Sequence, residues 1–261
     1  IFVEKLGQLE YLFRAQRGKH FNNYERMLPI KSKNSNRWNP KGFAFMYLGY
    51  DTEIAKYDET ISYIEKTCFE ELRLKKGEDV TVCEFKPVKK EGKIINFCYE
   101  DIDYSDIESE QEFVLNQLAQ QKVNQILSNP KTFSKLRQSS ELYKDIVKTV
   151  GNVNGDVKTI IQNETEIYLG KLLMKSIDEA VFLPIDESED PELSAYKPFH
   201  LLAKYLINEG YSGIIYRSTR MNLKGLKGKN LVLFNKDDVN YVDGTLKVYH
   251  CDEKNKFHLL Q

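Results

Sequence analysis

The chain has 261 residues, of which 41% are hydrophobic, and its formal net charge at pH 7 is -1. This length and composition suit one large domain with a full hydrophobic core. The near-zero net charge argues against a general nucleic-acid-binding protein, because such proteins usually carry a basic footprint. The four cysteines form no CxxC pair and have no histidine at metal-ligand spacing, so we expect reduced thiols and no zinc site.

The sequence also argues against several familiar classes of protein. It contains no apolar run of membrane-spanning length and no signal-peptide pattern, so we expect a cytoplasmic protein without membrane contacts. Its glycines follow neither the GxGxxG nor the Walker pattern, which argues against a Rossmann domain and a P-loop NTPase.

The first hundred residues predict, in chain order, a strand, a polar loop over a pocket, a second strand, a long helix and two more strands. Their expected bounds are 9–17, 18–41, 43–48, 52–75, 80–85 and 94–97. The helix is predicted because apolar residues recur at spacings of three and four, with Asp51 or Thr52 as its cap. Gly77 is expected to end it.

The middle of the chain has a different character. Acidic residues dominate 99–110, and long helical periodicity follows over 111–150. Two further helices are predicted over 166–177 and 198–208. We therefore expect an α+β core with a helical insertion at about 100–165, whose role is plain packing, a lid or a partner surface.

Residues 211–220 and 228–234 predict two neighbouring strands joined by a basic turn. Arg217, Ser218, Thr219 and Arg220 emerge where the first of these strands ends. Two cations and two hydroxyl groups at a strand end suit an anionic ligand, because guanidinium groups pair with phosphate in a forked geometry. A solvated hairpin rim has the same composition.

Five short segments, in this order, resemble the RES domain, a family named for its arginine, glutamate and serine. They are Leu12–Ala15, Arg37–Gly42, Phe45–Gly49, Thr67–Arg73 and the segment around Ser218. The resemblance covers roughly residues 9–98 and 165–236. No single segment is specific, but five in the same order are much more so.

The resemblance implies a single RES-type domain over 1–261, with an ADP-ribosyltransferase-like mixed β core and flanking helices. It also implies an enzyme that consumes NAD as a substrate, with no other cofactor, by cleaving the nicotinamide–ribose bond. Members of the family act as toxins, often neutralised by a helix-turn-helix antitoxin, and function in growth arrest or phage defence. The acceptor is left open between water, phosphate and a protein, and oligomerisation is also left open.

Cleavage of this bond passes through an oxocarbenium-like state, so it requires cations for the diphosphate, an aromatic surface for nicotinamide and a carboxylate near the ribose. Arg14 and Arg37 match the family's two arginines, which implies diphosphate binding. Tyr47 matches the family's tyrosine, which could stack on nicotinamide or hydrogen-bond the ribose. Trp38, the single tryptophan, is expected to line the same pocket.

Ser218 matches the family's serine. With no adjacent general base it is a poor nucleophile, so we interpret it as a hydrogen-bond donor to substrate or as a backbone cap. No histidine forms a triad with it, because His20, His200, His250 and His258 are scattered and Ser218 lacks a nucleophile-elbow context. Asn230 matches an asparagine before the returning strand and is expected to support the pocket.

Glu71 is the preferred catalytic carboxylate. It lies in a pattern similar to that of the family's helix, shortly before Gly77 and a strand. Its separation from Tyr47 is longer than is usual in the family, which favours Glu59 instead, although Glu59 lacks the downstream match. Glu70 is the third candidate, on a different face of the helix from its neighbour.

Two other functional classes stay open. One is a nucleotide- or RNA-binding module without catalysis, in which the basic segment 217–229 and the aromatic residues of the front half hold nucleobases. The other is an interaction protein that works mainly through the helical middle of the chain.

Overall fold

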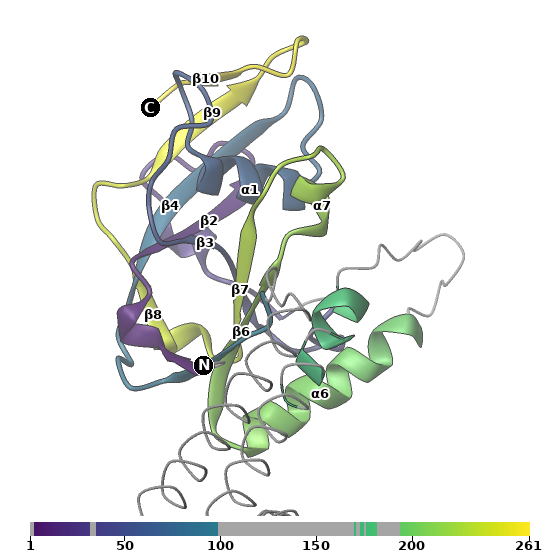
Figure 1. The fold of residues 1–261 in the computed structure, drawn as a ribbon. Helices are drawn as coiled ribbons and strands as arrows, with labels where there is room; N and C mark the ends of the chain where they lie inside the picture. The colour runs from purple at the N-terminus through teal and green to yellow at the C-terminus, as the bar shows by residue number, and fades with distance from the viewer. Residues whose placement is uncertain (1–2, 32–34, 99–169, 171–172, 175, 182–193) are drawn as a thin grey trace, which may run out of the picture. The chain divides into compact units, whose positions relative to one another are not determined.

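A computed structural model of the chain describes residues 3–31, 35–98, 170, 173–174, 176–181 and 194–261. Residues 1–98 and 177–261 form one compact unit, and Tyr99–Ser176 form a second. The helical insertion predicted at about 100–165 lies wholly outside the described residues, as does most of the helix predicted over 166–177. The fold below is that of the first unit (Figure 1).

The described residues form a mixed α+β fold around one large, mostly antiparallel sheet. The strand order is β1-β5-β6-β7-β3-β2-β4-β9-β10, and β8 pairs with β4. The strands are β1 (Val3–Lys5), β2 (Tyr11–Arg17), β3 (Met46–Asp51), β4 (Asp79–Pro87), β5 (Lys93–Asn96), β6 (Tyr211–Arg217), β7 (Lys229–Leu233), β8 (Val239–Tyr241), β9 (Lys247–Cys251) and β10 (Phe257–Leu259). Among these pairs, β5 and β6 run parallel. A parallel pair requires a long connection, and more than a hundred residues separate these two strands in the sequence.

Three α-helices accompany the sheet in the described residues with complete bounds: α1 (Tyr63–Glu71), α6 (Lys197–Asn208) and α7 (Thr219–Asn222). Short 3-10 turns cover Leu6–Gln8, Tyr24–Met27, Ser194–Tyr196 and Lys236–Asp238. α6 lies against β6, and α1 packs on β2 and β3 (Figure 1).

The strands predicted from the sequence and the helix predicted over 198–208 are confirmed, with their bounds shifted by a few residues. The pairing of the last two predicted strands is also confirmed, because Gly213–Arg217 align antiparallel with Lys229–Leu233. The sequence analysis missed β1, β8, β9 and β10, which are short strands near the two ends of the chain.

The helix predicted over 52–75 is wrong at both ends. Asp58 accepts hydrogen bonds from the backbone of Thr60 and Ile61 (2.7 and 2.8 Å), and this turn diverts the chain before a helix can start. Ser62 then caps α1, so neither Asp51 nor Thr52 does. The helix ends at Glu71 because Arg73 adopts a left-handed conformation, with φ of 52°, so Gly77 does not end it.

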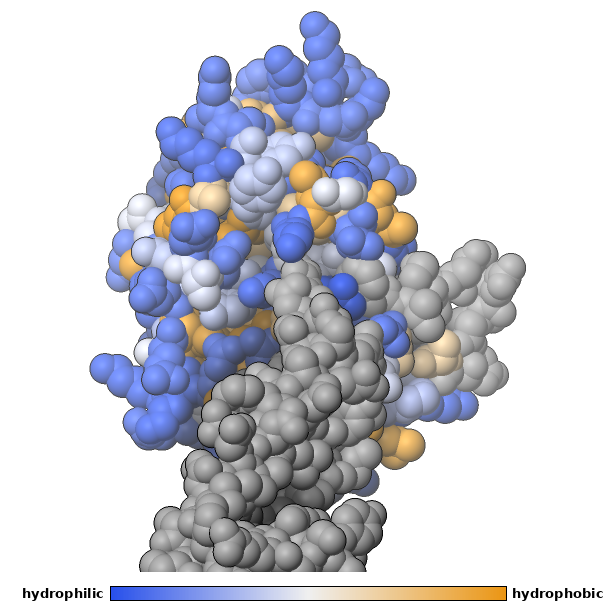
Figure 2. All heavy atoms as spheres, in the orientation of Figure 1, coloured by the Kyte–Doolittle hydropathy of each residue, from blue (hydrophilic) through white to orange (hydrophobic). Residues whose placement is uncertain are grey.

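Hydrophobic side chains pack on both faces of the sheet, as the alternation along its strands requires. On one face, Leu48, Leu231 and Ile215 belong to a core that also includes residues of β2, β4, β5 and β9. On the other face, α1 contributes Ile64, Cys68 and further residues to a second core. The view of Figure 2 shows a surface of mainly hydrophilic side chains, with hydrophobic ones in separate patches.

Two glycines allow α1 to lie close to the sheet and to the loop before β7. A Cβ atom on Gly49 of β3 would lie 2.7 Å from the Cys68 sulfur, and one on Gly228 would lie 2.5 Å from the Thr67 hydroxyl. Any larger side chain would push the helix outward. The end of α1 is therefore held beside the start of β7 and the end of β6.

The sheet opens between β2 and β3. These strands pair only from Tyr11↔Asp51 to Phe13↔Gly49. Beyond that point β2 continues with β4 as far as Arg17, whereas β3 continues with β7. Arg14 and Tyr47 lie on the two strands where they part.

Candidate active site

Glu71 of α1, Ser218 and Asn230 meet at the end of α1, although they lie far apart in the sequence. The Ser218 hydroxyl donates to Glu71 Oε1 at 2.6 Å, and the Asn230 side-chain amide donates to the same oxygen at 2.7 Å. Ser218 and Asn230 are 1% and 4% exposed, whereas Glu71 is exposed. No described residue donates to Glu71 Oε2, so this oxygen is free to meet a ligand.

Ser218 also caps the short helix α7, because its Oγ accepts a hydrogen bond from the Met221 backbone at 3.2 Å. Its single proton is directed to Glu71. Both sequence interpretations of Ser218, a donor and a cap, therefore describe this hydroxyl, but it donates to a carboxylate of the protein. Its environment is that of a group that orients Glu71, not of an activated nucleophile.

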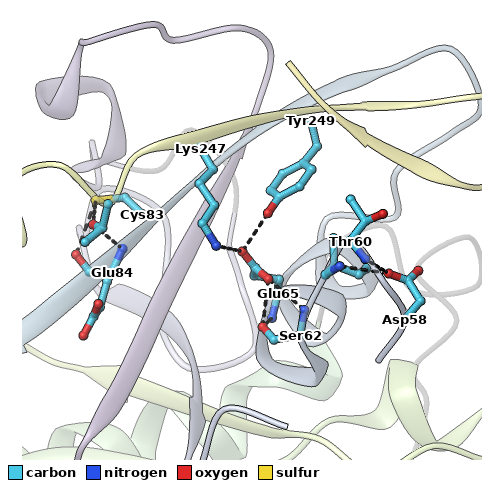
Figure 3. Close-up of polar contacts among 10 residues, drawn as sticks. Asp58, Thr60, Ser62, Glu65, Cys83, Glu84, Lys247 and Tyr249 are labelled. Atoms are coloured by element: carbon cyan, nitrogen blue, oxygen red, sulfur yellow. Dashed lines mark hydrogen bonds and ion pairs between the residues drawn. The ribbon is translucent and has the colours of Figure 1, made fainter. Parts of the chain in front are cut away.

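Helix α1 is fixed at both ends, and this sets the position of Glu71. At the amino end, Ser62 and Glu65 form a reciprocal capping box, and Glu65 also binds Lys247 and Tyr249 of β9 (Figure 3). At the carboxyl end, Arg17 of β2 donates to the backbone carbonyls of Leu72 and Arg73. The last carbonyls of a helix have no partner within the helix itself, so these bonds help to satisfy that end.

Arg14 spans the opening between β2 and β3. Its Nη1 donates to the backbone carbonyl of Tyr47 at 2.9 Å, a carbonyl that β2 no longer pairs. Its Nε is buried and has no acceptor within the described part of the chain. Burial lowers the pKa of Arg14 to about 10, so the side chain is still a cation at neutral pH. An anion that reached Nε would satisfy it.

The Tyr47 hydroxyl is turned toward the loop before β3. It donates to Asn39 Oδ1 at 2.7 Å and accepts from the backbone N–H of Trp38 at 3.3 Å. Burial raises the pKa of Tyr47, so this hydroxyl stays protonated. Tyr47 as a whole is half-buried, and its hydroxyl is engaged within the protein.

Trp38 is completely buried and packs among three aromatic rings, so it does not face an open pocket. Its ring lies 5.5–6.2 Å, centroid to centroid, from those of Phe97, Phe199 and Tyr216. Its role is to anchor the loop that carries the neighbouring Arg37.

Arg37 reaches from this loop to the start of α7. Its Nη1 lies 3.4 Å from the Thr219 hydroxyl and also donates to the backbone carbonyl of Val181. Thr219 follows Ser218 directly, so Arg37 lies close to the group that orients Glu71. Arg217, by contrast, forms a two-point ion pair with Asp178, whose side chain is 2% exposed (Nη2–Oδ2, 2.6 Å; Nε–Oδ1, 3.1 Å).

The other two candidate carboxylates have different surroundings. Glu70 binds Lys66 and Lys224 at 2.6 and 2.7 Å. Burial acts to raise the pKa of Glu70, but hydrogen bonds from Lys224 and Lys66 outweigh it, and the pKa is lowered. Glu59 is exposed in the turn before α1, not on the helix. Of the three, Glu71 alone contacts Ser218 and Asn230.

The sequence analysis did not single out Tyr216 or Asn39. Tyr216 lies on β6 two residues before Ser218, and therefore on the same face of the sheet, and it is 6% exposed. Burial, with Glu71 and Tyr47 nearby, raises its pKa well above the ordinary value. Asn39 is 1% exposed and accepts a hydrogen bond from the Tyr47 hydroxyl. A buried asparagine in a polar loop gives no signal in the sequence that distinguishes it from its exposed neighbours.

The four histidines take partners away from this cluster. They bind, in chain order, the Arg17 carbonyl, the Asn36 carbonyl, Asp79 and Asp252. Within the described ranges, no group of three or more His, Cys, Asp or Glu side chains is arranged to hold a metal ion. The described helices also include none with the length and apolar character needed to cross a membrane.

Comparisons with protein-family models, with curated proteins and with solved structures gave no match.

Proposed function

We propose that this chain is an NAD-consuming enzyme of the RES type that cleaves the bond between nicotinamide and ribose. The observation that carries the proposal is the Glu71 carboxylate. Two buried donors, Ser218 and Asn230, fix its Oε1, while Glu71 as a residue is exposed and no described residue donates to its Oε2. A fixed negative charge with one free oxygen is suited to stabilise positive charge that develops on a sugar.

In the proposed reaction the bond between C1′ of the ribose and N1 of nicotinamide breaks, and its electron pair stays on nicotinamide, which leaves as a neutral molecule. The acceptor then forms a new bond to C1′ and loses a proton. The acceptor is water, inorganic phosphate or a protein side chain. Glu71 acts on the positively charged ribose, so its contribution is largest in the transition state.

The cations and the aromatic ring have separate roles in this proposal. Arg14 and Arg37 hold the diphosphate, Arg14 through its unpartnered Nε and Arg37 beside Thr219. The Tyr47 ring stacks on nicotinamide, since its hydroxyl is engaged by Asn39. The proposed biological role is growth arrest or phage defence in the cytoplasm, with a helix-turn-helix antitoxin as the regulatory partner.

The alternative of an RNA- or nucleotide-binding module relies on the basic segment 217–229. Two of its cations are already paired, Arg217 with Asp178 and Lys224 with Glu70. An exposed carboxylate beside them would also repel a phosphate backbone. Both observations favour the enzyme.

The decisive experiment incubates the purified chain with NAD, with and without inorganic phosphate, and measures free nicotinamide. Glu71→Gln serves as the inactive control and Glu59→Gln as the matched control, because Glu59 is an exposed glutamate outside the cluster. Release by the parent and by Glu59→Gln, but not by Glu71→Gln, supports the proposal. A folded parent that releases no nicotinamide under either condition contradicts it. Salt-sensitive binding of single-stranded RNA by such an inert chain would favour the binding module instead.

A further inference from the structure

We infer that Asn39 is a positioning residue for Arg37, and that it acts through the hydroxyl of Tyr47. The inference rests on the proposed function, because it takes Arg37 to be a ligand of the substrate diphosphate. It adds to that function a residue in which the sequence showed no role, and it gives the Tyr47 hydroxyl a task other than substrate contact.

The first step is the orientation of the Asn39 side chain, which its hydrogen-bond partners fix. Its amide nitrogen donates to the backbone carbonyls of Pro40 and Phe43 at 3.3 and 3.2 Å. Carbonyls accept only, so the nitrogen must face them and the oxygen must face Tyr47. The Tyr47 hydroxyl donates to that oxygen at 2.7 Å, and the Asn36 side-chain amide also donates to it at 3.4 Å.

The second step is the link from Tyr47 to Arg37. With its proton directed to Asn39, the Tyr47 oxygen presents a lone pair to the backbone N–H of Trp38, at 3.3 Å. Trp38 follows Arg37 directly, so this bond fixes the peptide unit from which the Arg37 side chain departs. Without Asn39, the hydroxyl would be free to rotate toward other acceptors, and the peptide would lose its fixed partner.

The third step is the effect on the site. Arg37 must cross to Thr219, which follows Ser218, the donor to Glu71. A long side chain reaches such a target reproducibly only if its backbone is fixed. The loop is further closed by a hydrogen bond from Asn36 N to the Asn39 carbonyl at 2.9 Å. Asn39 therefore links β3 to the loop that carries Arg37, the residue proposed to bind the diphosphate.

The test measures binding of ADP, a diphosphate without nicotinamide, by isothermal titration calorimetry. It compares the parent with Asn39→Ala, Tyr47→Phe, their double variant, Arg37→Ala and Arg37→Ala combined with Asn39→Ala. Asn240→Ala is the matched control, because Asn240 is exposed on β8. Thermal unfolding of each variant reports the fold.

We expect Asn39→Ala and Tyr47→Phe each to weaken ADP binding about tenfold, the scale of one buried hydrogen bond. The double variant should be no weaker than either single variant, because the two changes break the same link. In the Arg37→Ala background, Asn39→Ala should have no further effect on ADP affinity. With NAD as substrate, KM should rise while kcat changes little.

A purely structural role for Asn39 would lower the melting temperature without this coupling to Arg37. If Asn39→Ala does not fold, Tyr47→Phe still tests the inference, because it breaks the same link and keeps the ring. A parent that binds no ADP overturns the inference, as does a tenfold loss that persists in the Arg37→Ala background. Nicotinamide release by a parent whose Tyr47→Phe variant keeps full ADP affinity would overturn this inference alone. Asn39-dependent ADP binding without nicotinamide release would remove the proposed reaction and leave the positioning role intact.

Discussion

Of the three glutamates on helix α1, Glu65 and Glu71 lie six residues apart and have carboxylates with opposite surroundings. Glu65 at the amino end is 2% exposed and has two partners on each oxygen: Ser62 N–H and Oγ–H on Oε2, Lys247 and Tyr249 on Oε1 (Figure 3). Glu71 at the carboxyl end is exposed, with two partners on Oε1 and none on Oε2 among the described residues.

The difference separates a structural carboxylate from the one that we propose to act on a substrate. A buried charge whose lone pairs are all used stabilises the arrangement that surrounds it and has nothing left for a ligand. A carboxylate that is oriented on one side and open on the other can meet a substrate without first losing a protein partner. Both residues are glutamates on one helix, so their environments, not their chemistry, assign the roles.

The largest expected effect is that of Glu71→Gln on turnover. The change keeps the size and hydrogen-bonding capacity of the side chain but removes the charge, so kcat should fall about 100-fold or more while KM changes far less. The free energy of unfolding of this variant should be close to that of the parent. Steady-state assays of nicotinamide release provide the measurement. An inactive Glu59→Gln variant together with an active Glu71→Gln variant would show that Glu59, not Glu71, is the catalytic carboxylate.

Glu65→Gln should have the opposite profile. A glutamine side chain has one oxygen that accepts, so it cannot accept from Ser62 and from Lys247 and Tyr249 in the way the two carboxylate oxygens do. The change also removes the negative charge that faces Lys247. We expect the free energy of unfolding to fall by about 2 kcal/mol. The kcat of the folded protein should stay within several-fold of the parent. Denaturant unfolding and turnover, measured on the same samples, test both statements, and a large kcat loss with unchanged stability would erase the contrast with Glu71.

Ser218→Ala should lower kcat about tenfold, because Glu71 keeps Asn230 as a donor but loses one of its two orienting bonds. The loss of the α7 cap should add about 1 kcal/mol of destabilisation. In the double variant with Glu71→Gln, the serine change should cost little more, since it acts through the carboxylate. Complete loss of turnover in Ser218→Ala alone, with folding retained, would instead indicate a direct chemical role for the hydroxyl.

The smallest effect concerns Glu70, which is paired with two lysines. Its folded-state pKa is lowered, so the pair contributes stability above the unfolded-state pKa and this contribution is lost as pH falls through the folded-state pKa. The stability difference between the parent and Glu70→Gln should therefore be full at neutral pH and shrink in acid, below about pH 4.5. Thermal unfolding from pH 7 to pH 3 measures it. At neutral pH, kcat should stay within several-fold of the parent, and a pH-independent difference would show that the lysine pairs do not stabilise the fold.

Local sequence alone determined most of the regular structure in the described part of the chain. The apolar runs on β2, β3, β4 and β6 predict strands because each run is short and bounded by turn residues. The existence of a helix before Gly77, though not its bounds, and the pairing of β6 with β7 could also be predicted from the sequence. The resemblance of five segments to one family selected Glu71, Ser218 and Asn230, which the fold brings together.

The tertiary structure decided the features that depend on partners distant in the chain. The start of α1 could not be predicted from periodicity, because the Asp58 turn competes with the helix and because Glu65, the partner of the Ser62 cap, is held by β9. The short terminal strands have too few residues to show a pattern of their own. The engagement of the Tyr47 hydroxyl by Asn39, of Arg217 by Asp178 and of Ser218 by Glu71 also appeared only in three dimensions. A side chain's chemistry is written in the sequence, but whether its donors and acceptors are free is set by the neighbours that folding brings to it.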